Sequence, residues 1–222
     1  MFVGHYGPAF AGKAVSRTIP LWVLFVAVQL IDILWTIFVL LGVEKVRIVP
    51  GITAANPLDL YYMPYTHSLV GAALWSIAAA VVYRVFRRGD PLIAAVIVGA
   101  AVFSHWVLDW LVHRPDLALY DDTLKVGLGL WNYPIPALVL ELAILFGGML
   151  LYLRTTEPAA RAGRYGMAVF VAVMAALQWA SIYAPPPPSD KAAAATGLVL
   201  YAVLTAVAWR LERQRAPRTT HR

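Results

Sequence analysis

Residues 91–113 read PLIAAVIVGAAVFSHWVLDWLVH and combine an apolar helix with ionisable side chains. The segment is long enough to cross a bilayer, because about 20 apolar residues suffice. Its last part carries His105, Asp109 and His113, whose spacing of four residues places them on one face of a helix. Ionisable groups at membrane depth are costly and mark functional sites, so this stretch predicts both the fold class and the place of the chemistry.

The composition of the whole chain agrees with a membrane protein. Of the 222 residues, 61% are hydrophobic and 14% are charged, which is more apolar than a soluble domain. We predict an all-α polytopic bundle of six transmembrane helices, from apolar runs at 20–42, 66–86, 91–113, 133–153, 165–184 and 192–209. Glycines, a proline and basic residues interrupt residues 1–19, which are expected to form a short re-entrant or interfacial half-helix.

The basic residues predict the orientation of this single domain, residues 1–222. If the six spans alternate, thirteen of the 18 lysines and arginines fall on one side, which the positive-inside rule makes cytoplasmic. Both ends of the main bundle then face the cytoplasm. We expect residues 20–113 to carry the site, 133–211 to be scaffold helices and 212–222 to be a basic cytoplasmic tail. The net charge of +6 is therefore explained by the topology in the membrane, where lipids are the expected partners. It indicates no nucleic-acid partner.

Polar side chains of five segments are expected at one depth, in the outer half of the bundle. At about 1.5 Å per helical residue, Asp32 lies about 18 Å from the turn at Pro20, and His105 lies about 21 Å from Pro91. The remaining members reach this layer by the same count. The set is His5, Asp32, His67, His105, Asp109 and Glu141.

Such convergence predicts a metal site. The chain has no cysteine, which leaves nitrogen and oxygen donors for a divalent ion such as zinc or manganese. We expect His67, His105 and Asp109 as ligands, with His5 and Asp32 as further ligands. His113 lies about 12 Å along the helix from His105, too far for one ion to bind both. The expected catalytic or proton-transfer residues are Asp32, Glu141 and His113.

Other interpretations of the same residues stay open. His67 and His105 could instead hold a haem between two helices. A set of Asp32, His105, Asp109 and Glu141 could form an ion or proton relay, or a polar network that only fixes helix packing. The loop acids and the histidine of the tail are expected to be solvated; these are Asp59, Asp116, Asp121, Asp122 and His221.

The order of these motifs resembles a known family. An early His5, Asp32 at the end of the first hairpin, Thr66-His67-Ser68 and Ser104-His105-x-x-Leu108-Asp109 follow one another. This pattern, over residues 5–113, resembles the YdjM-like membrane-bound metal-dependent hydrolases of the bacterial inner membrane. Where that family has two acids and a histidine, Leu30-Ile31-Asp32-Ile33-Leu34 keeps one acid.

The resemblance implies a hydrolase and an inner-membrane location. Together with the polar layer, it leads us to expect a metal-dependent hydrolase of a lipid-like or membrane-associated ester, a phosphoester foremost. The site should open toward the outer leaflet, where a metal ion lowers the pKa of water and polarises the ester. The alternative is a membrane protein without enzymatic activity, which binds haem, serves as an ion or proton relay, or uses the polar network only to fix helix packing.

Overall fold

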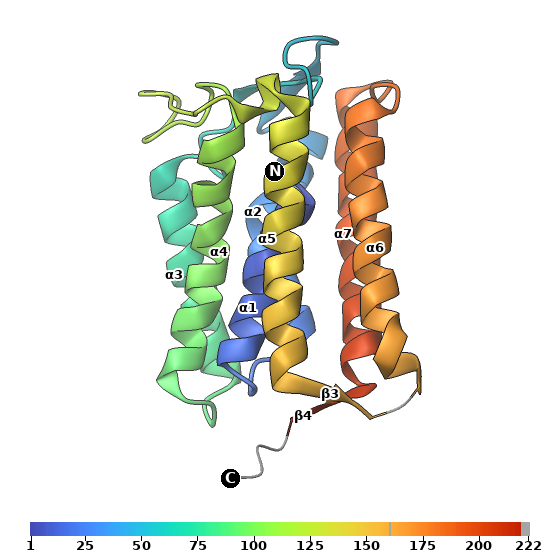
Figure 1. Ribbon diagram of the computed structural model, residues 1–222. Coiled ribbons are helices and arrows are strands. Elements are labelled where there is room, and N and C mark those ends of the chain that lie inside the picture. Colours follow the sequence, from blue (N-terminus) through green and yellow to red (C-terminus); the bar gives the residue numbers. More distant parts are fainter. Residues whose placement is uncertain (160, 219–222) are drawn as a thin grey trace.

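Six long helices form the body of the protein. The computed structural model describes residues 1–159 and 161–218 (Figure 1). Each long helix contains a segment that is long and apolar enough to cross a membrane, which confirms the prediction of six apolar helices of spanning length. The helices are α2 (Leu21–Leu40), α3 (Leu69–Phe86), α4 (Leu92–Val112), α5 (Pro134–Thr155), α6 (Arg161–Tyr183) and α7 (Asp190–Glu212).

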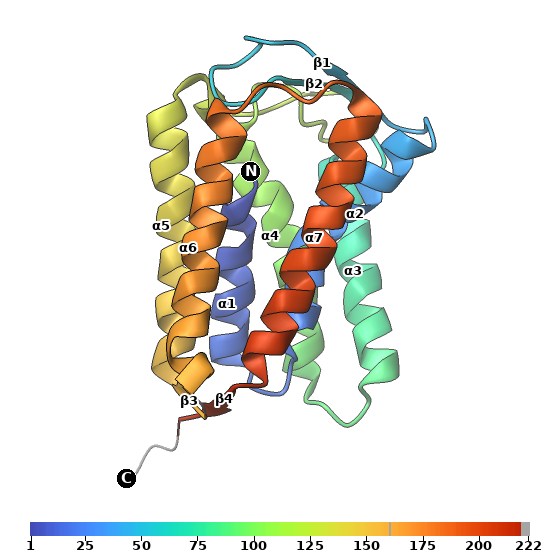
Figure 2. The same ribbon diagram turned by 90° about the vertical axis from the view of Figure 1, so that its right-hand side faces the viewer.

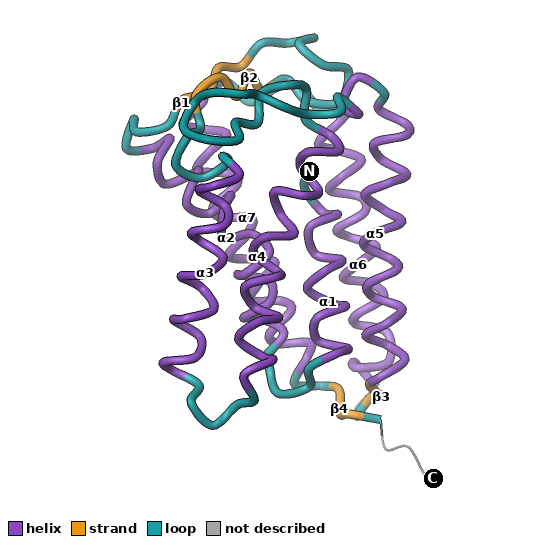
Figure 3. The backbone as a smooth tube through the Cα atoms, turned by 90° about the vertical axis from the view of Figure 1, so that its left-hand side faces the viewer, coloured by secondary structure: helices purple, strands orange, loops and turns teal. Residues whose placement is uncertain are grey.

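A short amino-terminal helix lies inside this bundle. A single 3-10 turn, η1 (Val3–His5), leads into α1 (Tyr6–Val15), and α1 packs against α5, α2 and α4 (Figure 3). Tyr6 and Phe10 are completely buried. The structure therefore contains the predicted short amino-terminal helix, and this helix is packed among the long helices.

Two glycines allow α1 to approach α5 at backbone distance. A Cβ atom at Gly7 would meet the carbonyl oxygen of Ile144, and one at Gly148 would meet the backbone of Gly7. Small residues at such crossings let helix backbones touch. The glycines of the amino-terminal segment, expected to interrupt a helix, thus serve as its packing surface.

The two ends of the bundle differ, and we call them the loop side and the turn side. The loop side carries an antiparallel hairpin of β1 (Lys45–Ile48) and β2 (Leu58–Tyr62), the 3-10 turn η2 (Leu130–Asn132), and the loops around residues 113–129 and 184–189. The turn side carries short connections and an antiparallel pair of β3 (Thr156–Pro158) and β4 (Arg215–Pro217).

These small sheets add to the all-α architecture that the sequence predicts. Part of the expected tail, 212–222, is β4, while residues 219–222, including His221, lie outside the described residues.

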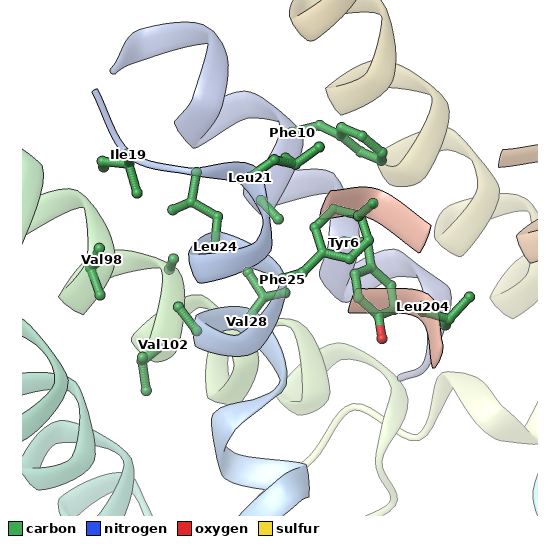
Figure 4. Packing of buried hydrophobic residues seen from close by; sticks show 14 of the residues in the cluster. Tyr6, Phe10, Ile19, Leu21, Leu24, Phe25, Val28, Val98, Val102 and Leu204 are labelled. Carbon is green, nitrogen blue, oxygen red and sulfur yellow. The ribbon is translucent and has the colours of Figure 1, made fainter. Parts of the chain in front are cut away.

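The core on the turn side is apolar. Side chains of α1, α2, α4 and α7 interlock there (Figure 4). The ring centroids of Tyr6 and Phe25 are 4.6 Å apart, and those of Phe10 and Tyr152 are 5.6 Å apart. This packing fixes the turn-side halves of α2 and α4, so that the polar residues in their other halves meet on the loop side.

Candidate metal centre

Four donor atoms from three segments meet between α2 and α4. Nε2 of His67 lies 3.3 Å from Oδ1 of Asp32 and 3.7 Å from Oδ2 of Asp109. Nε2 of His105 lies 3.4 Å from the same Asp32 oxygen and 3.1 Å from the same Asp109 oxygen. In a tetrahedral zinc site with bonds of about 2.0–2.1 Å, neighbouring donor atoms are about 3.4 Å apart. The four nitrogen–oxygen distances are close to this value, so the two imidazoles and two carboxylates are spaced as ligands of a metal ion.

The other carboxylate oxygen of Asp109 faces a third histidine, His5. Nε2 of His5 lies 3.1 Å from Oδ1 of Asp109, and the amino nitrogen of Met1 forms an ion pair with the same oxygen. The rings of His5 and His105 are stacked, with centroids 3.7 Å apart and planes 6° apart. All five predicted ligands therefore come together, in two overlapping groups that share His105.

Unpartnered atoms at the centre fit a bound cation. Nε2 of His105 and both ring nitrogens of His5 are buried and have no hydrogen-bond partner among the described residues. Leaving a buried polar atom unsatisfied costs about 1–3 kcal/mol. A metal ion would accept the lone pairs of such nitrogens, so the donor set suits a metal better than a purely structural network.

His67 and His105 are each oriented by a hydrogen bond at Nδ1, the ring nitrogen that does not face the centre. Nδ1 of His105 donates to the carbonyl oxygen of Val28 at 2.7 Å. A carbonyl can only accept, so Nδ1 carries the hydrogen and the Nε2 lone pair of the neutral ring faces the site. Such second contacts fix the tautomer and orientation of metal-binding histidines.

His67 is oriented by a chain of side chains. The hydroxyl of Thr66 donates to Glu44 at 2.6 Å, and its oxygen then accepts a hydrogen bond from Nδ1 of His67 at 2.8 Å. Glu44 also accepts hydrogen bonds from two backbone N–H groups of residues 65 and 66. Burial is the strongest influence on this loop carboxyl and raises the pKa of Glu44, against the opposing effects of His67 and Thr66.

The start of α3 places His67 in its turn. The prediction began this span at residue 66, whereas the helix begins at Leu69 because Ser68 is its N-cap, with the Oγ atom accepting from the N–H of Gly71 at 3.0 Å. His67 thus precedes the helix. Trp106 of α4 fixes it there by donating from its indole nitrogen to the His67 carbonyl oxygen at 3.0 Å.

His113 forms a separate histidine–carboxylate pair beside the centre. It is the C-cap of α4, and its Nδ1 lies 2.8 Å from Oδ1 of Asp116. Its Nε2 lies 3.8 Å from Oδ1 of Asp109, and the residue belongs to neither ligand group. The Nε2 of the neutral ring therefore has a lone pair directed toward the centre without being one of the ligands.

Glu141 binds the amino-terminal segment. Its Oε2 accepts hydrogen bonds from the backbone N–H groups of Phe2 at 2.8 Å and Gly4 at 3.2 Å. Its Oε1 accepts from the side-chain amide of Gln178 at 3.1 Å. Both oxygens are thus engaged, and the contacts make Glu141 the group that holds η1, and with it His5, against the centre.

A cavity of about 620 Å³ opens from the centre toward α6, α7 and the loop side. Asp32 and His67 line its inner end, and the Asp32 side chain is 14% exposed. Tyr201 of α7 borders the cavity and donates from its hydroxyl to Oδ2 of Asp32 at 3.0 Å. This contact leaves Oδ1 of Asp32 directed toward the two histidines.

Two of the loop acids are buried, contrary to the prediction that they are solvated. The hairpin register places Arg47 opposite Asp59, and the Arg47 guanidinium lies 2.5 Å from Oδ2 of Asp59. Arg114 forms ion pairs with both Asp59 and Asp116. For Asp59 the prediction was wrong because Arg114 comes from another loop, which a sequence read locally does not bring near. For Asp116 it overlooked the neighbouring Arg114 and His113, with which the carboxylate pairs. Asp121, in contrast, is exposed.

Some contributors could not be found from the sequence. Glu44, Tyr201 and Val28 were not singled out, and each acts through contacts with residues distant in the sequence. The only sequence signal among them is that Glu44 is an acid close to the end of an apolar run.

Comparisons with known proteins add no assignment. No protein-family model matches the chain, and no curated protein or solved structure shows significant similarity to it. The resemblance of residues 5–113 to the YdjM-like hydrolases therefore stays a prediction, and the arguments about function rest on the geometry of the centre.

Proposed function

We propose that this chain is a membrane-bound hydrolase that uses a divalent metal ion to cleave an ester of a lipid-like or membrane-associated substrate, a phosphoester foremost. The observation that carries the proposal is the spacing of 3.1–3.7 Å between the imidazole nitrogens of His67 and His105 and the carboxylate oxygens of Asp32 and Asp109. We place the centre toward the outer leaflet of a bacterial inner membrane, from the positive-inside distribution of arginines and lysines and from the family resemblance.

The nitrogen and oxygen donors suit zinc or manganese. Such an ion would be held among Asp32, His67, His105 and Asp109, whose imidazole nitrogens and carboxylate oxygens face one another. When bound, it supplies Lewis acidity and lowers the pKa of water to about 7. His5 adds a neighbouring imidazole on the second Asp109 oxygen.

The best candidate for proton transfer is His113. Of the three predicted catalytic residues, Asp32 belongs to the ligand set, and both oxygens of Glu141 are engaged. His113 lines the cavity, is oriented by Asp116, and directs a ring nitrogen toward the centre. A histidine oriented by a carboxylate is the usual arrangement of a general base.

Two alternatives explain less of the geometry. A haem between His67 and His105 requires a separate space for the macrocycle, whereas both Nε2 atoms lie within 3.4 Å of one Asp32 oxygen. A relay across the bundle requires polar groups at successive depths, whereas the turn-side core of the described chain is the apolar cluster of α1, α2 and α4.

The test is elemental analysis of detergent-purified protein, with an absorbance spectrum of the same sample. We expect about one or two equivalents of zinc or manganese, lost in a His105→Ala/Asp109→Ala double variant and kept in Asp122→Asn. Asp122 is a suitable control because its ion pair in the described part of the chain is with Lys125, on the loop side. A folded wild type without metal contradicts the proposal, and a Soret band with iron supports haem.

Metal-loaded protein should then hydrolyse phosphoester probes, and His113→Gln should lower turnover while metal content stays unchanged. A screen in which wild type and the double variant show equal activity would remove the hydrolase assignment and leave a metal-binding protein.

A further inference from the structure

The cavity beside the centre lies between α6 and α7. Its α7 wall contains Ala193, Thr196 and Leu200, which share one helix face by their spacing of three and four residues. Its α6 wall contains Ser181 and Ile182. The residues are small or apolar, so this part of the cavity suits a hydrocarbon chain.

The two helices are separated on the loop side. α7 packs mainly against α2 and has few contacts with α6, and Figure 2 shows α6 and α7 diverging from the turn side toward the loop side. The cavity occupies this divergence, since residues of both helices line it. An opening between two helices of a bundle leads sideways out of the protein.

The surroundings of this opening are membrane hydrocarbon if the six helices span the bilayer. Large apolar side chains on the outer faces of α6 and α7 are exposed, among them Trp179 at 57% and Val199 at 64%. Exposed apolar surface of this extent on candidate spans is a lipid-facing surface. Material that enters between the helices therefore comes from the bilayer.

The outer border of the cavity is also suited to lipid. Pro185–Pro188 and the loop residues Pro50, Pro57 and Leu58 line this border. Proline lacks a backbone N–H group, so four successive prolines expose no unsatisfied donors to an apolar ligand. The inner border is polar, with Asp32, His67 and Asp109. The cavity thus has a polar inner end and an apolar side opening, which matches the two ends of a phospholipid.

From this arrangement we infer that a membrane phospholipid binds in the cavity, with its phosphate at the metal centre and one acyl chain leaving between α6 and α7 along Ala193, Thr196 and Leu200. The cavity volume of about 620 Å³ is that of one small-molecule site, so the second chain stays in the bilayer. The inference rests on the proposed function, for which it names the substrate class and its route.

Photolabelling tests the route. The full chain is reconstituted in vesicles of phosphatidylglycerol and phosphatidylcholine that contain phosphatidylglycerol with a diazirine on one acyl chain, irradiated, and mapped by mass spectrometry. We expect adducts on Thr196 and Leu200, which line the cavity. We also expect adducts on Val199 and Val203, which are exposed on α7 but do not line the cavity and are called the outward residues. In Thr196→Trp, which fills the cavity, the Leu200 adduct should be lost and the outward adducts kept. Val199→Trp is the matched control and should retain the Leu200 adduct.

Two results would overturn the inference. One is labelling of the outward residues without any adduct on the cavity residues of folded wild type. The other is rapid modification of Thr196→Cys by a charged, water-soluble thiol reagent, at the rate of Asp122→Cys, because it shows a water-filled cavity. The chain has no native cysteine to interfere.

The same samples separate the two proposals. Cavity adducts should persist in His105→Ala/Asp109→Ala, because neither residue belongs to the apolar wall. If wild type gives cavity adducts but binds no metal, the proposed metal-dependent hydrolase is contradicted and the lipid site stands. If wild type binds metal but gives no cavity adducts, the lipid site is contradicted and the metal-dependent hydrolase stands.

Discussion

The amino-terminal helices and the last helix pair of this bundle are built differently. In α4 and in the turn before α3, the histidine ligands are held by hydrogen bonds to a carbonyl oxygen and to a threonine hydroxyl, and α1 touches α5 through backbone. In α6 and α7, the facing residues near the cavity are small, and the helices diverge. A metal centre requires donor atoms fixed to within a fraction of an ångström, whereas access requires space. The comparison indicates that one bundle meets both needs by assigning them to different helices.

The largest expected effect comes from removing the shared carboxylate. Asp109→Asn keeps the size of the side chain but removes the charge that faces His105 and His67 on one oxygen and His5 on the other. We expect loss of bound metal in elemental analysis and loss of hydrolysis. Retention of full metal content would show that the four-atom site is not the binding site.

A packing change should break the rigid region without touching a ligand. At Gly148 a new Cβ atom meets the backbone of Gly7, whereas at Gly147 it meets nothing within 4 Å. We expect Gly148→Ala to destabilise the protein by about 1–3 kcal/mol, the usual cost of overpacking. Gly147→Ala should be near neutral. Thermal unfolding in detergent compares the two, and equal stability would contradict the close α1–α5 contact.

The contact that orients His67 should have a smaller effect. Glu44→Gln keeps an acceptor for Thr66 but removes the charge behind the hydroxyl that contacts His67. Loss of such an outer partner lowers metal affinity by about 10–100-fold. Competition with a chelator measures this change. Glu157→Gln, in β3 on the turn side, is the control and should leave the affinity unchanged.

The smallest effect is expected where the two regions meet. Tyr201→Phe removes the hydrogen bond of α7 to Asp32, but that carboxylate borders the cavity, so water can replace the hydroxyl. We expect a loss of about 1 kcal/mol in metal binding, roughly fivefold. An effect as large as that of Glu44→Gln would show that α7 is part of the rigid region.

Sequence reasoning succeeded where a property is periodic or depends on depth. Apolar runs located the six spans, and residue counts from the helix ends brought Asp32 and His105 to one layer. It failed where a contact depends on the fold of loops: Asp59 and Asp116 were expected in water but are paired with Arg114. It also missed Tyr201, because nothing in an alanine-rich helix shows which neighbour a tyrosine will meet. Long-range pairs of this kind have no local signature.

The hydrogen bonds of Glu141 to the backbone of Phe2 and Gly4 join residues 139 and 137 positions apart in the chain. During synthesis, all five predicted ligands therefore leave the ribosome before the carboxylate that holds η1 in place. A chain that stops after α4 would contain every donor atom but would lack the two Glu141 hydrogen bonds to η1. The segment that carries His5 is thus fully held only once α5 is in place.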